Sequence, residues 1–371
     1  MSTSTRSRIV SLDQFRGYTV AGMFLVNFIG GYAAIHPIFN HHNTYCSYAD
    51  TIMPQFFFAV GFAYRLTFLR RLERDGAKAT YLHAVRRCLG LALVGLVVYG
   101  LDGRYRAWAD LRELGAWGFL CTAFQDRLWQ ALVHIAVTSL WVLPVIGRSA
   151  KVRLAFLAAS TLANVIILHG GYYDWVFAVS TNDGGPLGFL IWALPMLVGS
   201  FAYDVVAARG PRKALTPLAV WAVVLMAGGY GLSCINTVKL ALADPDGAGT
   251  VWAWFVEPPF VPPTRPVDMW TMSQRAGTVS YHTFAAGFSL GVYSLFVVLC
   301  DIGSLRVGVF RTLGTNALAG YVIHDVVASR FIPFVPEDSP LWHVVLCFAL
   351  FFGITYVLVL HLEKSGIYLR L

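Results

Sequence analysis

The side chains best suited to chemistry gather in the first 65 residues of the chain. They are Asp13, Arg16, Asn27, His41, His42 and Asp50. A neutral imidazole can take a proton from an amine or a hydroxyl near neutral pH, and a carboxylate can hold the other ring nitrogen in place. The pattern indicates proton transfer, with His41 or His42 as the base and Asp50 as the group that orients it. A helix cap is the other interpretation of Asp50.

The composition places these groups in a membrane protein. The chain has 371 residues, a mean hydropathy of +0.61 and 13% charged residues, whereas soluble domains carry about 25%. The apolar runs are too long for membrane strands and do not alternate with polar residues. The sequence therefore predicts an all-α polytopic membrane protein that forms one domain over residues 1–371.

Ten spanning helices of about 20 residues each are predicted. We expect them near 14–34, 50–69, 87–101, 129–147, 152–169, 186–207, 215–234, 279–300, 310–327 and 341–361. Most of the 28 basic residues fall on alternate connections, which predicts that both termini are cytoplasmic. Residues 235–278 then form a long extracytoplasmic loop. The net charge of +8 lies beside the apolar runs and not in one patch, so we expect no nucleic-acid partner.

The first predicted span carries a polar stripe. Arg16 and Asn27 are eleven residues apart, close to three helical turns, and Asp13 lies one turn before Arg16. Asp13 can therefore pair with Arg16, which either snorkels to the membrane surface or, together with Arg65, attracts a phosphate-bearing ligand. Asn27 falls deep in the predicted span, where an amide needs a protein partner or a wet cavity.

Two later segments add supporting candidates. Tyr281 and His282 stand at the start of the eighth predicted span, and Asn316 and His324 share one face of the ninth. They either support a site or form hydrogen bonds between helices. Adjacent histidines chelate poorly and the six cysteines are scattered, so no metal site is predicted.

Residues 8–65 contain four motifs: SLDQFRG, the dipeptide VN, the tripeptide FNH, and AD followed by a proline-phenylalanine pattern. Together they resemble the heparan-α-glucosaminide N-acetyltransferase family and its bacterial relatives, which are transmembrane acyltransferases. Weaker similarity covers about 270–326 and includes SYHTFAAGFSLGVYSLFVVLCD and NALAGYVIHD. The family's Trp-Asn-Gly after the histidine is replaced by NTYCSYAD.

This resemblance implies an enzyme that moves an acetyl or other acyl group from cytoplasmic acyl-CoA to an extracytoplasmic sugar or glycan. It places a hairpin histidine at the acyl centre, as general base or acyl carrier, with Asn27 beside it; the FNH step favours His41 over His42. It also implies a multi-pass protein of the bacterial inner (plasma) membrane. It leaves the oligomeric state undetermined between a monomer and a dimer. The competing hypothesis is a transporter or flippase of a small polar or lipid-linked solute, whose pathway the polar stripe would line.

Overall fold

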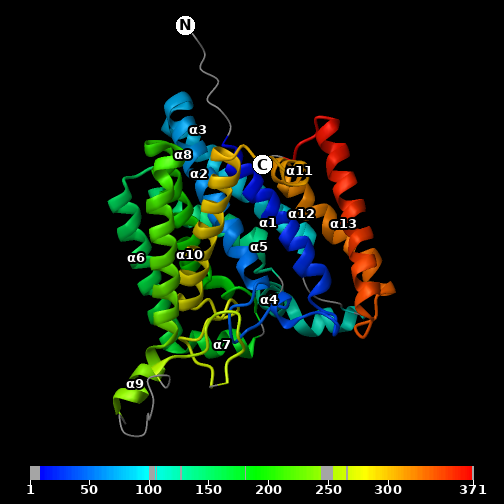
Figure 1. Ribbon diagram of the computed structural model, residues 1–371. Helices are drawn as coiled ribbons and strands as arrows, with labels where there is room; N and C mark the ends of the chain where they lie inside the picture. Colours follow the sequence, from blue (N-terminus) through cyan, green and yellow to red (C-terminus); the bar gives the residue numbers. More distant parts are fainter. Residues whose placement is uncertain are drawn as a thin grey trace.

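A computed structural model of the chain describes residues 9–99, 105, 107–125, 128–179, 181–243, 254–264 and 266–369. Helices are the regular structure of these ranges, in which no strand occurs (Figure 1). Some of the basic residues on which the predicted topology rests (Arg6, Arg8 and Arg370) and part of the predicted loop 235–278, including Trp252, lie outside the described residues.

The α-helices follow one another as a long series with short connections. They are α1 (Val10–Ile29), α2 (Ile52–Asp75), α3 (Ala77–Tyr99), α4 (Trp108–Gln125), α5 (Ala131–Ile146), α6 (Ala150–Ile167), α7 (Tyr173–Ala178), α8 (Phe189–Ser233), α9 (Ile235–Ala243), α10 (Val279–Phe296), α11 (Gly308–Thr315), α12 (Ala317–Phe331) and α13 (Leu341–Lys364). Short 3-10 helices include Pro37–Phe39, Ala49–Thr51 and Gly185–Leu187, and wider π turns cover Leu168–Tyr172 and Val297–Ile302.

Each of the ten ranges that the sequence predicted as spans contains helix among its described residues. Within the described part of the chain, six helical segments are long and apolar enough to cross a membrane, and α5 is a shorter apolar helix. The chain is therefore an all-α, multi-pass integral membrane protein. The polar α1 and the split pair α11 and α12 are not among the six. Two predicted spans are fused into α8, where Gly210 (φ 70°, ψ 166°) interrupts the helical backbone at a conformation that glycine tolerates.

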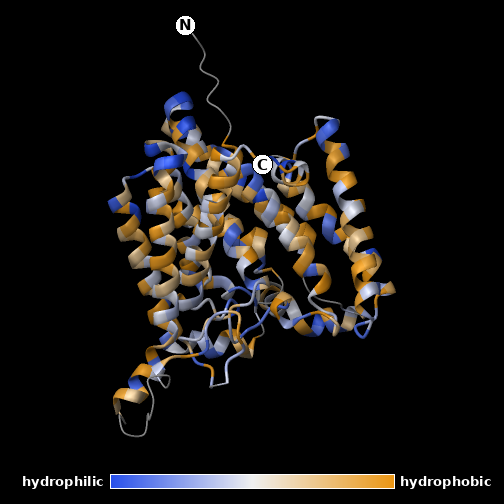
Figure 2. Ribbon diagram, viewed as in Figure 1, coloured by the Kyte–Doolittle hydropathy of each residue, from blue (hydrophilic) through white to orange (hydrophobic). Residues whose placement is uncertain are grey.

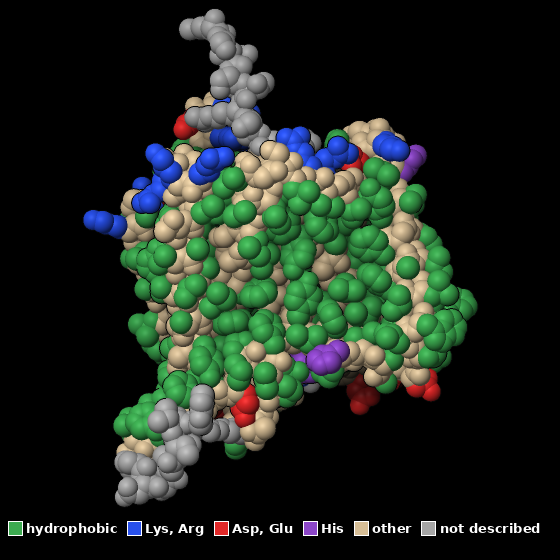
Figure 3. Space-filling view, viewed as in Figure 1, with side chains coloured by type: hydrophobic (Ala, Val, Ile, Leu, Met, Phe, Trp, Pro, Cys, Tyr) green, Lys and Arg blue, Asp and Glu red, His purple; other side chains and the backbone are tan. Residues whose placement is uncertain are grey.

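The two ends of the helical bundle differ in charge. Lys and Arg side chains gather at the end where α1 begins and α13 ends, while apolar side chains cover the middle (Figure 3). The ribbon coloured by hydropathy shows the same apolar middle (Figure 2). The basic end agrees with the predicted gathering of both termini and the basic connections on one side of a membrane.

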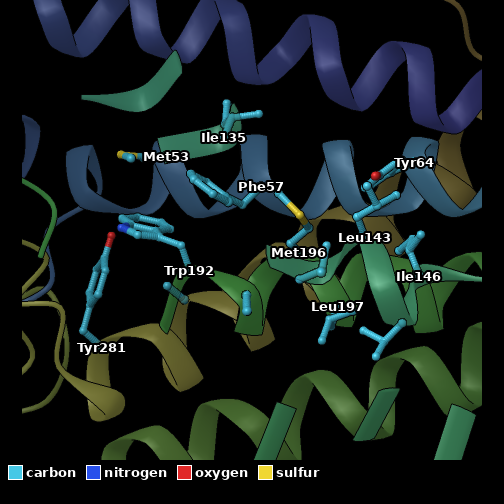
Figure 4. Packing of buried hydrophobic residues seen from close by; sticks show 14 of the residues in the cluster. Met53, Phe57, Tyr64, Ile135, Leu143, Ile146, Trp192, Met196, Leu197 and Tyr281 are labelled. Atoms are coloured by element: carbon cyan, nitrogen blue, oxygen red, sulfur yellow. The ribbon is translucent and has the colours of Figure 1, made fainter. Parts of the chain in front are cut away.

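The core is built where α2, α5, α8 and α10 meet. Phe57 of α2 stacks on Trp192 of α8 with ring centroids 4.4 Å apart, and Tyr281 of α10 packs at the edge of Trp192 (Figure 4). Gly61 lets α2 approach α8 closely, because a Cβ there would lie 1.7 Å from the Met196 carbonyl oxygen. This close packing holds the ends of these helices in place, and with them the loops at the less basic end of the bundle.

Candidate functional site

A cavity of about 340 Å³ lies where α1 ends and where α2 and α5 begin, at the opposite end of α1 from the basic end of the bundle. Four predicted catalytic residues line it: Asn27, His41, His42 and Asp50. The other polar lining residues are Asn43, Gln130, Asn182, Asp183, Gln274, Arg275 and Tyr321. They come from α1, the segment 30–51, the start of α5, two loops and α12. The fold thus brings together six separate stretches of the chain at one polar site.

The centre of the site is a histidine–carboxylate pair. The Nδ1 atom of His41 lies 2.9 Å from Oδ1 of Asp50, whose side chain is only 1% exposed. Oδ2 of Asp50 accepts hydrogen bonds from the backbone N–H and the hydroxyl of Ser47, each at 2.9 Å. Ser47 therefore fixes the position of the Asp50 carboxylate, and the carboxylate fixes the orientation of the His41 imidazole. It does not act as a side-chain cap of α2.

The electrostatic setting makes His41 a stronger base. Burial lowers the pKa of His41, but the hydrogen bond and charge of Asp50, together with the charge of Asp183, outweigh it and raise the pKa above its usual value. The His41 side chain is still 53% exposed, toward the cavity that it lines. With Nδ1 on Asp50, Nε2 is the nitrogen that remains for a substrate.

His42 is arranged differently from His41. Its backbone N–H donates to Oδ2 of Asp50 at 3.3 Å. Its ring stacks on Tyr45 with centroids 4.2 Å apart, and its Nε2 lies 2.8 Å from the Pro37 carbonyl oxygen. The ring of His42 is thus used to fold the loop, whereas the ring of His41 is paired with a carboxylate.

Asn27 reaches the cavity from α1. Its Nδ2 atom lies 3.4 Å from Nε2 of His324 on α12, and the residue is exposed where its neighbours are buried. The Asn27 amide therefore has a protein partner and also faces a cavity, the two environments expected for it from the sequence. The predicted end of the first helix was wrong: α1 ends at Ile29 and not near residue 34, so Asn27 lies two residues from the helix end.

Sequence reasoning did not identify Asp183, the second carboxylate of the cavity. Its Oδ1 accepts a 2.7 Å hydrogen bond from Nε2 of Gln274. Burial raises the pKa of Asp183 to about 6, although the Gln274 hydrogen bond and the nearby His41 lower it. The surrounding TNDGG looks like an ordinary turn, and its distance in sequence from residues 27–50 gave no signal that the two segments meet.

Tyr281 supports the site from behind. Its hydroxyl lies 2.6 Å from the backbone oxygen of Asp50 and 3.1 Å from Oε1 of Gln274. His282 is buried beside Trp192, with Nδ1 2.9 Å from the Thr278 carbonyl oxygen. Neither lines the cavity. Tyr281 thus links Asp50 to Gln274, which is the hydrogen-bond partner of Asp183. His282 contributes only to the packing of the helices.

Asn316 does not share a continuous helical face with His324, contrary to the prediction. The helix breaks at Asn316, between α11 and α12, where its backbone has φ −123° and ψ 46°. Its amide donates to the Ile367 carbonyl oxygen at 3.0 Å and accepts from the Leu369 N–H at 3.2 Å. Asn316 therefore anchors the C-terminal segment, and it is His324 that reaches the cavity residue Asn27.

The predicted donor-binding residues lie toward the basic end. Asp13 and Arg16 pair at 3.9 Å, as their spacing predicted. Arg65 is buried and donates to Asp204 at 3.0 Å and to the Ile146 carbonyl oxygen at 2.6 Å. Arg153 also binds Asp204. The guanidinium of Arg65 is thus engaged by protein groups, while Arg16 keeps a side chain that is one-third exposed.

The fold and the cavity define a class: a multi-pass helical membrane protein with a histidine–carboxylate pair in a polar cavity at one end. Comparison with protein-family models found no matching family, and a search of curated proteins found no match either.

Proposed function

We propose that the chain is a membrane-embedded acyltransferase that moves an acetyl or other acyl group from acyl-CoA to a sugar or glycan acceptor. The observation that carries the proposal is the 2.9 Å contact between His41 and a buried, hydrogen-bonded Asp50 at the edge of the cavity. Such a pair sets the tautomer of the imidazole and leaves Nε2 to accept a proton. The motif resemblance to the heparan-α-glucosaminide N-acetyltransferase family supports the same class of reaction.

In the proposed reaction, Nε2 of His41 takes the proton from an acceptor hydroxyl or amine. The acceptor oxygen or nitrogen attacks the thioester carbonyl, the new bond forms, and the carbon–sulfur bond breaks. The proton then passes from His41 to the departing thiolate. The Asn27 amide lines the same cavity and can donate to the carbonyl oxygen as it gains negative charge. Attack by His41 itself, giving a transient acyl-imidazole, is the two-step version.

The donor is proposed to enter from the basic end, which we assign to the cytoplasm on the positive-inside rule. Both termini are then cytoplasmic, ten segments cross the bilayer of the bacterial inner membrane, and the cavity faces outward. Arg16 is the side chain proposed to attract the donor's phosphates. Asp13 and Asn27 are fourteen residues apart on one helix, about 21 Å at 1.5 Å per residue, which is the distance that the donor's arm must cover.

The test is acyl transfer by the purified full-length protein in proteoliposomes. Radiolabelled acetyl-CoA is supplied on one side, and released CoA and labelled sugar are measured with a panel of hexoses and amino sugars. We expect His41→Ala to reduce CoA release by about 10²- to 10⁴-fold. The matched control is His36→Ala, which removes an exposed loop histidine that does not line the cavity.

The proposal fails if CoA release is the same in the wild type, His41→Ala and His36→Ala, or if the wild type releases no CoA with any acyl donor. Uptake of a labelled sugar into the same vesicles without acyl-CoA would instead support the transporter hypothesis. That outcome is read from the same preparation, so the two functions are separated in one experiment.

A further inference from the structure

We propose that Asp183, which lines the same cavity as the His41–Asp50 pair, binds a hydrogen-bond donor group of the acceptor and thereby determines which acceptors are used. This inference rests on the acyl transfer proposed above and assigns the part of the cavity that recognises the acceptor. Three independent features support it: the backbone of Asp183, the hydrogen bond of its carboxylate and the lining of the cavity.

The backbone of Asp183 is held in an uncommon conformation. Its φ is +55°, in the left-handed region that residues other than glycine seldom adopt. Its carbonyl oxygen accepts a 2.8 Å hydrogen bond from the indole of the fully buried Trp192, and the next N–H, from Gly184, donates to the Arg275 carbonyl oxygen at 2.9 Å. Such strain persists where surrounding contacts enforce it, and it is concentrated at functional sites.

The carboxylate of Asp183 is fixed in position. Among the described residues its hydrogen-bond partner is Gln274, which occupies Oδ1 at 2.7 Å. Gln274 accepts in turn from the hydroxyl of Tyr281, and the same hydroxyl contacts the backbone oxygen of Asp50. The buried Tyr281 therefore contacts the backbone of Asp50 directly and the carboxylate of Asp183 through Gln274. This arrangement keeps the acceptor-binding group at a constant distance from the base, as transfer between two bound groups requires.

The walls of the cavity suggest what the acceptor presents. The lining combines apolar side chains of α1 and α2, including Met23, Ile52 and Phe56, with the polar residues Asn182, Asp183 and Gln274 of two loops. A cavity of about 340 Å³ is at the small end of ligand pockets. These walls fit one sugar-sized ring, which has C–H groups on its face and hydroxyl or amine groups at its edge.

The test is the variant Asp183→Asn in the full-length protein. Asparagine tolerates the left-handed backbone and its oxygen can still accept from Gln274. Its NH₂ group then replaces Oδ2, so a donor on the acceptor meets a donor on the protein. Because the charged acceptor is lost and a donor takes its place, we expect binding to weaken by about tenfold to a hundredfold.

Binding is measured without acyl donor, as the thermal stabilisation of detergent-solubilised protein by glucose and by glucosamine. Stabilisation by glucose identifies a hydroxyl as the bound donor, and stabilisation by glucosamine alone identifies an ammonium group. Asp338→Asn is the matched control, because Asp338 is an exposed carboxylate outside the cavity.

Equal binding by the wild type and Asp183→Asn overturns the inference, as does a wild type that binds neither sugar. Weaker binding by Asp183→Asn alone supports it. Because no acyl-CoA is present, these results are independent of the test for CoA release. A protein that binds sugar through Asp183 but never releases CoA would refute the transferase and leave the binding residue established.

Discussion

His41 and His42 are adjacent in the chain, yet only the His41 ring meets Asp50 through its side chain, at 2.9 Å. The His42 ring lies instead against Tyr45 and the Pro37 carbonyl oxygen. The backbone N–H of His42 does contact Asp50, at 3.3 Å. A single carboxylate thus orients one imidazole and secures the backbone of the next residue.

This difference predicts unequal effects of matched substitutions. His42→Phe keeps an aromatic ring that can stack on Tyr45, so we expect CoA release within a few-fold of the wild type. His41→Phe removes the proposed base, and we expect a loss of about 10²-fold or more. Initial rates of CoA release with saturating acetyl-CoA check the prediction. The reverse order of effects would assign the chemistry to His42.

The pH dependence follows from the raised pKa of His41. Below that pKa the imidazole is protonated and cannot accept a proton, so we expect CoA release to rise with pH through a midpoint above about 6.5, the ordinary histidine value. Stability responds in the opposite direction. A folded-state pKa above the unfolded value stabilises the fold at low pH, and this contribution is lost as the pH rises through the folded pKa. Rates and thermal midpoints measured across neutral pH test both trends, and His41→Ala should flatten both.

Asp50→Asn removes the negative charge of the side chain but keeps its size and shape, so it tests the effect of the charge alone. Because Asp50 raises the pKa of His41, the variant should shift the midpoint of the pH–rate profile to lower pH while reducing the maximal rate. The new amide would also turn an NH₂ group toward the Ser47 and His42 donors or toward His41, so we expect a lower thermal midpoint too. A reduced rate with an unshifted midpoint would mean that Asp50 acts only through the loop and not through the imidazole.

Arg65 and Arg16 are expected to respond differently to removal. Asp204 neutralises both Arg65 and the fully buried Arg153. Asp204→Asn leaves two arginines without their carboxylate. Because the Asp204 side chain is 32% exposed, we expect the cost to lie below the roughly 3–5 kcal/mol typical of a fully buried pair. We expect a large drop in thermal midpoint for Asp204→Asn and Arg65→Ala, but little change for Arg16→Ala. Arg16→Ala should instead raise the KM for acyl-CoA; an unchanged KM would remove Arg16 from the donor site.

The sequence predicted the fold class and the helix positions well, because long apolar runs specify membrane helices almost directly. Helix ends were less predictable. The run that begins at residue 14 continues to 34 in hydropathy, yet Gly30 follows Ile29 at the end of α1 and Asn27 is left near that end. Similarly, spacing by four made Asn316 and His324 look like neighbours, but the helix breaks at Asn316 itself.

The candidate site was predictable where its residues are close in sequence and not where distant loops meet. His41 and Asp50 are nine residues apart, so one loop can join them. Asp183 and Gln274 are 91 residues apart, and each lies in a segment without a distinctive pattern. The packing of Trp192 between Phe57, His282 and Tyr281 brings these segments to the cavity.

Close helix packing makes certain glycines sensitive to substitution. A Cβ on Gly17 would lie 1.8 Å from the Phe310 carbonyl oxygen, so Gly17→Ala must push α11 away from α1. We expect a destabilisation of about 1–3 kcal/mol or more. Gly353→Ala is the control, because no atom lies within 4 Å of a Cβ at that helical position. Thermal unfolding in detergent compares the two, and equal midpoints would show that α11 can move without cost.

The cavity takes Asn27 from the first helix and Tyr321 from α12, near the other end of the chain. When α12 has not yet been synthesised, the chain already contains His41, Asp50 and Asp183, but it lacks Tyr321 and His324, the partner of Asn27. The complete cavity can therefore form only after nearly the whole chain has been made.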